Sequence, residues 1–158
     1  MLKKLSAVTL TTLLLLIPVP VAAAKVEPAG GAVIYGQPYE ASMASRVTAM
    51  ASHLDGNGYW VATANGMVLN FGSAGHFGDM DSVTLNQPVV GMAPTKTGNG
   101  YWLVASDGGI FSFGDAAFYG SAGAVVLNSP IVGMAATNAG RGYWLVAADG
   151  GVFSYGDA

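Results

Sequence analysis

Residues 100–116 read GYWLVASDGGIFSFGDA, and this stretch decides the fold because a related copy lies on either side of it. Residues 58–74 read GYWVATANGMVLNFGSA, and residues 142–158 read GYWLVAADGGVFSYGDA. The copies start 42 residues apart in both intervals, without insertion or deletion. A fixed period in the low forties is typical of stacked structural units or propeller blades.

The similarity extends over most of the chain. Residues 89–116 and 131–158 are identical at 20 of 28 positions, whereas 47–88 and 89–130 are identical at 17 of 42, so the first copy has diverged. We therefore predict one repeat domain over residues 32–158. Its units are a partial one at 32–46, two full ones at 47–88 and 89–130, and a partial one at 131–158.

Each unit reads as four short strands. In the last copy the first three strands are residues 130–137, 143–147 and 152–155. The fourth strand is seen in the middle copy, at residues 117–123. The Asp-Gly-Gly sequence between the second and third strands is a strong hairpin signal. The sequence thus predicts an all-β protein with four-stranded units.

The second strand is apolar on both of its faces. Tyr101, Leu103 and Ala105 point one way, while Trp102 and Val104 point the other. A sheet with one wet face would alternate apolar with polar residues. Face-to-face stacking of small sheets covers both faces, which favours β-propeller-like blades, about three of them, in a partial propeller. A linear β-solenoid is the main alternative.

The phase of the repeat suggests an assembly. Residues 34–36 lie 42 positions before 76–78, which lie 42 before 118–120, so the domain opens with a lone fourth strand and closes after a third strand. Three blades are too few for a closed ring. One interpretation is a homodimer that completes a six-bladed ring by exchanging the lone strand. The other is a piece of a longer protein cut inside a repeat.

The N-terminus has the pattern of an export signal. Residues 1–24 contain two lysines, an apolar core and Ala22-Ala23-Ala24, which is a small-residue cleavage site. We predict an N-terminal signal helix at 1–24, a linker at 25–31, and a secreted or envelope-associated product that does not contact the membrane after cleavage. An uncleaved anchor is the competing interpretation. There is no cysteine, so packing must supply the stability.

Charge narrows the choice of partners. Only 9% of residues are charged, and without residues 1–24 the chain has four basic and nine acidic residues. An acidic chain of this kind is a poor candidate for nucleic-acid binding, which usually needs a basic face.

The segments GYWLVASDGGIFSFGDAAFYGSAG and PIVGMAATNAGRGYWLVAADGG resemble a repeat family of secreted actinobacterial proteins. The resemblance covers about residues 32–158. It implies propeller-like repeats, export, and a binding or scaffolding role beside separate hydrolase, protease or cell-wall domains. It carries over no catalytic residues. The first copy departs from the pattern, with Asn65-Gly66-Met67 for Asp-Gly-Gly and Ser73 for Asp115.

No catalytic or metal-binding set stands out. The two histidines, His53 and His76, both lie in the diverged copy, and a Ser/His/Asp site needs three converging groups. Asp107, Asp149 and the matching Asn65 suit tight turns better than calcium, which needs six to eight oxygen ligands. We therefore predict a protein that is not an enzyme and that holds neither metal nor cofactor.

Two sets of residues are candidates for ligand contact. The aromatic rings of Trp60, Trp102 and Trp144 could stack on sugars, although packing between blades explains them better. The loop before each tryptophan varies among the copies and carries Asn57, Asn99 and Arg141 at equivalent positions. Variable surface loops often carry binding residues.

Together these features predict a non-enzymatic binding or scaffold module of the cell envelope or the extracellular space, with a glycan or a protein as its ligand. The alternative is the repeat region of a larger exported hydrolase or cell-wall enzyme whose catalytic domain lies elsewhere.

Overall fold

The computed structural model describes residues 32–38 and 45–158, so the predicted signal helix at 1–24 and the linker at 25–31 lie outside the described residues. The described part contains strands and turns and no helix. Nine strands form three antiparallel sheets of three strands each. The first sheet is β1 (Val47–Ser52), β2 (Gly58–Thr63) and β3 (Val68–Gly72), the second is β4 (Val89–Pro94), β5 (Gly100–Ala105) and β6 (Ile110–Gly114), and the third is β7 (Ile131–Ala136), β8 (Gly142–Ala147) and β9 (Val152–Gly156).

The three sheets repeat one another in detail. Each is a simple meander in which the second strand lies between the first and the third. In each sheet the register shifts near the start of the first strand, between Val47 and Ala49, between Val89 and Gly91, and between Ile131 and Gly133. A bulge at the same place in each copy bends the first strand and adds twist. The sequence repeat is thus a structural repeat, as predicted.

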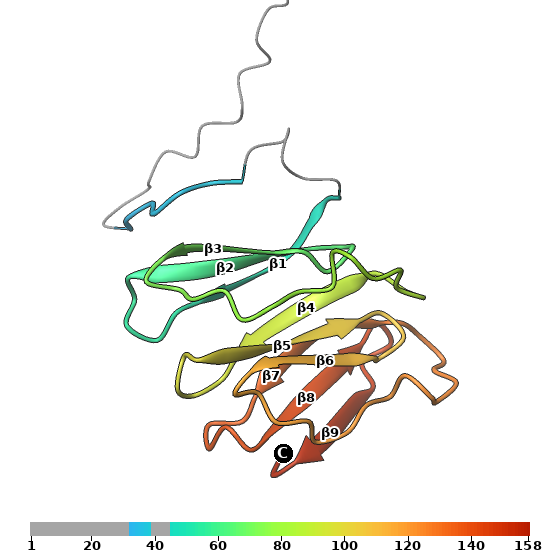
Figure 1. Cartoon of the computed structure of the whole chain (residues 1–158). Coiled ribbons are helices and arrows are strands. Elements are labelled where there is room, and N and C mark those ends of the chain that lie inside the picture. The colour runs from blue at the N-terminus through green and yellow to red at the C-terminus, as the bar shows by residue number, and fades with distance from the viewer. Residues whose placement is uncertain (1–31, 39–44) are drawn as a thin grey trace, which may run out of the picture.

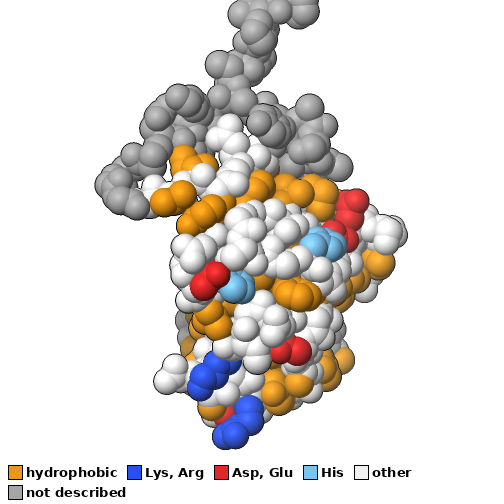
Figure 2. Space-filling view, turned by 60° about the vertical axis from the view of Figure 1, so that its left-hand side comes forward, with side chains coloured by type: hydrophobic (Ala, Val, Ile, Leu, Met, Phe, Trp, Pro, Cys, Tyr) orange, Lys and Arg blue, Asp and Glu red, His pale blue; other side chains and the backbone are white. Residues whose placement is uncertain are grey.

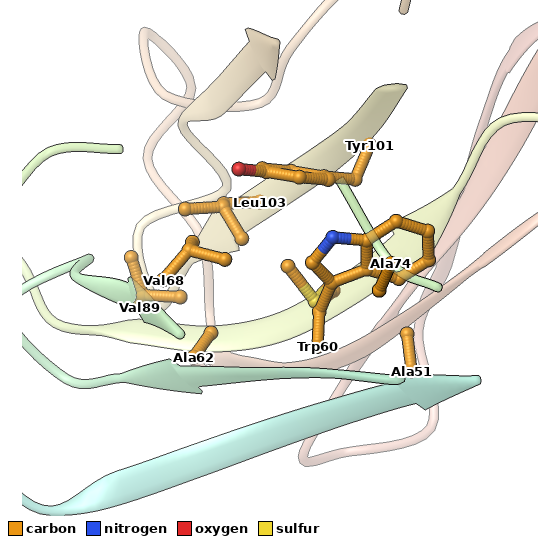
Figure 3. Close-up of a cluster of buried hydrophobic side chains, with 9 residues drawn as sticks. Ala51, Trp60, Ala62, Val68, Ala74, Val89, Tyr101 and Leu103 are labelled. Carbon is orange, nitrogen blue, oxygen red and sulfur yellow. The ribbon is translucent and has the colours of Figure 1, made fainter. Parts of the chain in front are cut away.

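The sheets are stacked face to face in chain order, with β4 lying between β1 and β7 (Figure 1). Between the first two sheets, Trp60 and Ala62 of β2 point toward Tyr101 and Leu103 of β5 (Figure 3). Between the second and third sheets, the residues on the opposite face of β5 pack in the same way against β8. Removing these apolar faces from water is the main stabilising contribution to the stack.

The two-faced burial predicted for the middle copy is confirmed. All six residues of β5 are buried. Tyr101 and Leu103 belong to the core shared with the first sheet, whereas Trp102 and Val104 belong to the core shared with the third. An apolar strand of this kind is stable in water only because both neighbouring sheets cover it.

The prediction of four-stranded sheets is wrong, because residues 34–36, 76–78 and 117–123 form no strand. Their backbone groups are bonded to side chains instead. The Tyr101 hydroxyl donates to the carbonyl of Gly78 at 2.6 Å and accepts from the N–H of Phe77 at 3.3 Å. Tyr143 makes the same pair of bonds to Gly120 and Tyr119. A tyrosine hydroxyl therefore makes the backbone hydrogen bonds that a neighbouring strand would make in a four-stranded sheet.

These connecting segments pack on the sheet that follows them. Gly78 lies against the ring of Phe113, where an added Cβ would come within 2.9 Å of the ring, and its φ of +123° disfavours other residues. Residues 34–36 pack in the same way on the first sheet of the same chain. The hydroxyl of Tyr59 donates to the carbonyl of Gly36, which lies against Phe71. Residues 34–36 therefore pack on the first sheet without forming a strand of it, as residues 76–78 pack on the second.

Candidate functional site

In each of the two interfaces between sheets, the tryptophan of one copy packs against the tyrosine of the next. The rings of Trp60 and Tyr101 have centroids 5.6 Å apart, and Trp102 and Tyr143 repeat this arrangement at the same distance. The indole N–H of Trp60 donates to the carbonyl of Gly75 at 2.7 Å. Trp60 and Trp102 are 0% and 1% exposed, so these two predicted ligand contacts lie inside the stack and have the packing role.

Trp144 differs from the other two tryptophans because, among residues 32–38 and 45–158, no sheet packs on its face of the third sheet. It is 40% exposed, and it shares an open apolar face with Val146 and Val152. We call these three residues the open face. The equivalent face of the second sheet, which includes Trp102 and Val104, is covered. Exposed apolar surfaces of this kind often mark an interaction site.

The predicted loop residues lie at one end of the sheets, one for each sheet. Asn57, Asn99 and Arg141 are all exposed. In each, the backbone carbonyl accepts from the N–H of the residue just after the third strand, at 3.0 Å in the first unit and 3.1 Å in the others. Two of the side chains are asparagine and the third is arginine, and no hydrogen bond between described residues joins one of the three to another. They are separate surface positions on an equivalent backbone.

The same loops contain a polar cluster that we call the end lock. In the second unit Thr95 donates to the Asp115 carboxylate at 2.8 Å, which ties the loop before β5 to the end of β6. In the third unit Thr137 donates to Asp157 at 2.6 Å, and Arg141 lies 3.4 Å from the same carboxylate. The end lock is therefore a repeated structural bond between two turns.

The first unit has the same lock with its parts exchanged. The carboxylate comes from Asp55 in the loop and the hydroxyl from Ser73 after β3, at 2.9 Å. Asp55 also accepts from Nδ1 of His53 at 2.8 Å and from the N–H of Asn57 at 2.8 Å. The bond from His53, followed by the others, lowers the pKa of Asp55 to about 2. Both orders of carboxylate and hydroxyl give the same connection.

A Ser, a His and an Asp thus lie together, but their geometry is not that of a proton relay. Nδ1 of His53 faces both Asp55 and the Ser73 hydroxyl, which lies 3.4 Å from it. A relay needs the nucleophile on one ring nitrogen and the carboxylate on the other. The other histidine, His76, pairs with Asp79 at 3.3 Å. Figure 2 shows both histidines on one face of the stack with acidic side chains beside them.

Asp107 and Asp149 form turns, in agreement with the sequence. Asp107 accepts from the N–H of Gly109 at 2.9 Å, and Asp149 accepts from Gly151 at 3.0 Å. The matching Asn65 instead donates to Asp81 at 2.7 Å. Among residues 32–38 and 45–158 no three ligating side chains form a group suited to a metal ion.

Sequence reasoning missed the end lock and the role of the tyrosine hydroxyl. One signal was available for the lock, since the loss of Asp at position 73 accompanies the gain of Asp at position 55, in place of Thr97 of the next copy. An exchange of this kind between two sites 18 residues apart indicates contact. Nothing in the sequence pattern shows that Tyr101 bonds to the backbone of residues 77 and 78.

Neither a model of a known protein family nor a curated protein matches this chain. In the part of the chain that the structure describes, no helix has the length and apolar character needed to cross a bilayer.

Proposed function

We propose that this chain is an exported, non-enzymatic binding or scaffold module of the cell envelope or the extracellular space, with a glycan or a protein as its ligand. The observation that carries the proposal is the end lock. The most polar clusters of the described chain recur in all three units as bonds between turns, with the residue types exchanged and the connection kept. Because these polar groups bond to one another in every unit, they support a structural role and therefore a scaffold protein.

The same proposal includes the finer architecture and the export. The stack of similar sheets, with the first strand β4 in contact with both β1 and β7, supports a partial propeller in which these strands lie nearest the axis. A charged n-region and a small-residue cleavage site support secretion.

Binding to purified cell walls tests the function. The mature chain should sediment with insoluble wall material, and digestion of either the wall glycan or the wall protein should release it. Failure to bind any wall or matrix fraction, together with hydrolysis of a wall substrate, would contradict the proposal. That second result would favour the alternative role, as part of a larger exported hydrolase.

We further propose that two chains pair to give a ring of six sheets. The open face supports this pairing, because its equivalents on the first two sheets are each covered by another unit of the same repeat. Since residues 34–36 are already bonded to the first sheet, we place the second copy against the open face and do not invoke strand exchange.

Light scattering of two matched variants tests the pairing. The mature chain should have the mass of a dimer, and Val152→Lys should give a folded monomer because it puts a charge on the open face. Val126→Lys is the control, since Val126 is 97% exposed and lies outside that face. A folded wild-type monomer would overturn the ring.

A further inference from the structure

A shallow groove runs across the other end of the sheets, opposite the end locks. It consists of three adjoining pockets between the hairpin turns and the segments that connect one sheet to the next, with volumes of about 390, 290 and 320 Å³. The middle pocket shares Val83, Asn86 and Gln87 with the first and Gln87 and Asp107 with the last. The three therefore form one continuous surface from Ser45 to Pro130.

The two outer pockets are the same site in successive repeats. Every residue that lines the last pocket lies 42 positions after a residue that lines the first. Four of these pairs are identical in type, namely Val83 and Val125, Leu85 and Leu127, Asn86 and Asn128, and Pro88 and Pro130. This identity holds although the first copy has diverged elsewhere. Both pockets therefore present the same four side chains at the same sequence spacing.

The walls of the groove are held by hydrogen bonds that also repeat. The N–H of Val89 donates to the carbonyl of Ala64, and the N–H of Ile131 donates to that of Ser106, both at 2.9 Å. The N–H of Ser106 donates to the carbonyl of Pro88 at 2.9 Å. The rim is therefore formed before any ligand arrives, which lowers the entropic penalty of binding. It also leaves these backbone groups unable to pair with an added peptide strand.

The chemistry of the lining favours a neutral ligand rich in hydroxyl groups. Asn86 and Asn128 are exposed, and each amide offers donors and an acceptor to a ligand. Valine, leucine and proline side chains supply apolar walls in both outer pockets, and serine, threonine and glutamine side chains add neutral polar groups. Asp107 is the one charged residue that lines the three pockets, so an anionic polymer would be repelled.

We propose that this groove binds an extended, neutral polysaccharide whose successive units occupy successive pockets. Stacked sheets lie about 10 Å apart, which is on the order of the length of one disaccharide in an extended chain. A polymer of identical units matches identical pockets, whereas the side chains of a peptide vary along its length. This inference rests on the proposed function and names its ligand class and its site.

Calorimetry with neutral oligosaccharides of increasing length tests the proposal, using β-1,4-linked oligomers of glucose and of N-acetylglucosamine. For one of the two series, affinity should rise steeply when the oligomer enters both outer pockets, at about four sugars given the spacing of the sheets. Asn86→Ala or Asn128→Ala should each lower the affinity for a long oligomer about tenfold. Either substitution should also remove the dependence of affinity on oligomer length. The matched control, Asn138→Ala, removes an exposed amide at the opposite end and should leave affinity unchanged.

The outcomes separate this inference from the proposed function. If the control variant loses the oligosaccharide and the groove variants keep it, the groove is not the site, although a binding module remains. If neither series binds while the mature chain still sediments with cell walls, the ligand class is wrong. Binding of an extended peptide in the groove, abolished by the same two substitutions, would also overturn it. Failure of the wall binding itself would remove the proposed function.

Discussion

The second and third sheets have almost the same residues on one face but bury them differently. Trp102 and Val104 are 1% and 0% exposed, whereas Trp144 and Val146 at the equivalent positions are 40% and 39% exposed. The local sequence is YWLVA in both strands. Burial on this face is therefore supplied by the following sheet and not by the strand itself. The open face therefore shows the surface that the following sheet covers in the first two units.

The largest effect that this comparison predicts is at its two tryptophans. Trp102→Ala removes a ring from a packed interface and should lower the free energy of unfolding by about 3–5 kcal/mol. Trp144→Ala, made in the monomeric Val152→Lys variant, should cost about 1 kcal/mol or less, because the ring there contacts water. Urea unfolding of both variants measures the difference. Equal losses would mean that the two faces are equally covered.

The tyrosine hydroxyls should give the next largest effect. Tyr101→Phe leaves the carbonyl of Gly78 and the N–H of Phe77 without their partner, which should cost about 1–3 kcal/mol. Tyr155→Phe is the control, because none of the hydrogen bonds described for this part of the chain involves its hydroxyl, and it should cost about 0.5 kcal/mol or less. If both variants unfold at the same urea concentration, the hydroxyl does not hold the connecting segment.

The end locks should not distinguish the covered sheet from the open one. Thr95→Val and Thr137→Val each remove one hydrogen bond to a carboxylate within the same unit, and each should cost about 1 kcal/mol. Thermal unfolding of the two variants checks whether the losses agree. A much larger loss in the second sheet would show that its lock depends on the neighbouring sheet.

The smallest predicted effect depends on pH and belongs to the first unit. The pKa of Asp55 is lowered from 3.8 to about 2, so its ionised form stabilises the folded chain above pH 4, and this contribution is lost as the pH falls toward 2. The wild type should therefore be more stable than Asp55→Asn at pH 6, and the difference should shrink below pH 4. A difference that is constant from pH 6 to pH 2.5 would contradict this assignment.

The repeat and its strands could be predicted from sequence alone because the relevant signals are local. The apolar run from Tyr101 to Ala105 indicates a strand, and the sequence around Asp107 indicates a tight turn, without reference to the rest of the chain. The fourth strand was predicted wrongly because Phe118-Tyr119-Gly120 has the composition of a strand. Its backbone partner is a side chain 24 residues away from Tyr119, which no local pattern reveals.

The candidate site was predictable only in part. The three loop positions are exposed, as expected of a variable loop. The fate of the tryptophans was not predictable residue by residue, since Trp102 and Trp144 have the same neighbours in sequence and differ only in the sheet that follows. The groove lies at the opposite end from those loops, and it became visible only when the connecting segments were placed beside the hairpin turns.

Fluorescence quenching of the three tryptophans tests the face-to-face stacking most directly. Acrylamide should quench one accessible tryptophan in the monomeric Val152→Lys variant, and adding Trp144→Phe should abolish that accessible fraction. The emission that remains, from Trp60 and Trp102, should resist quenching because both rings lie between sheets. Full and equal quenching of all three in a folded chain would contradict the stack.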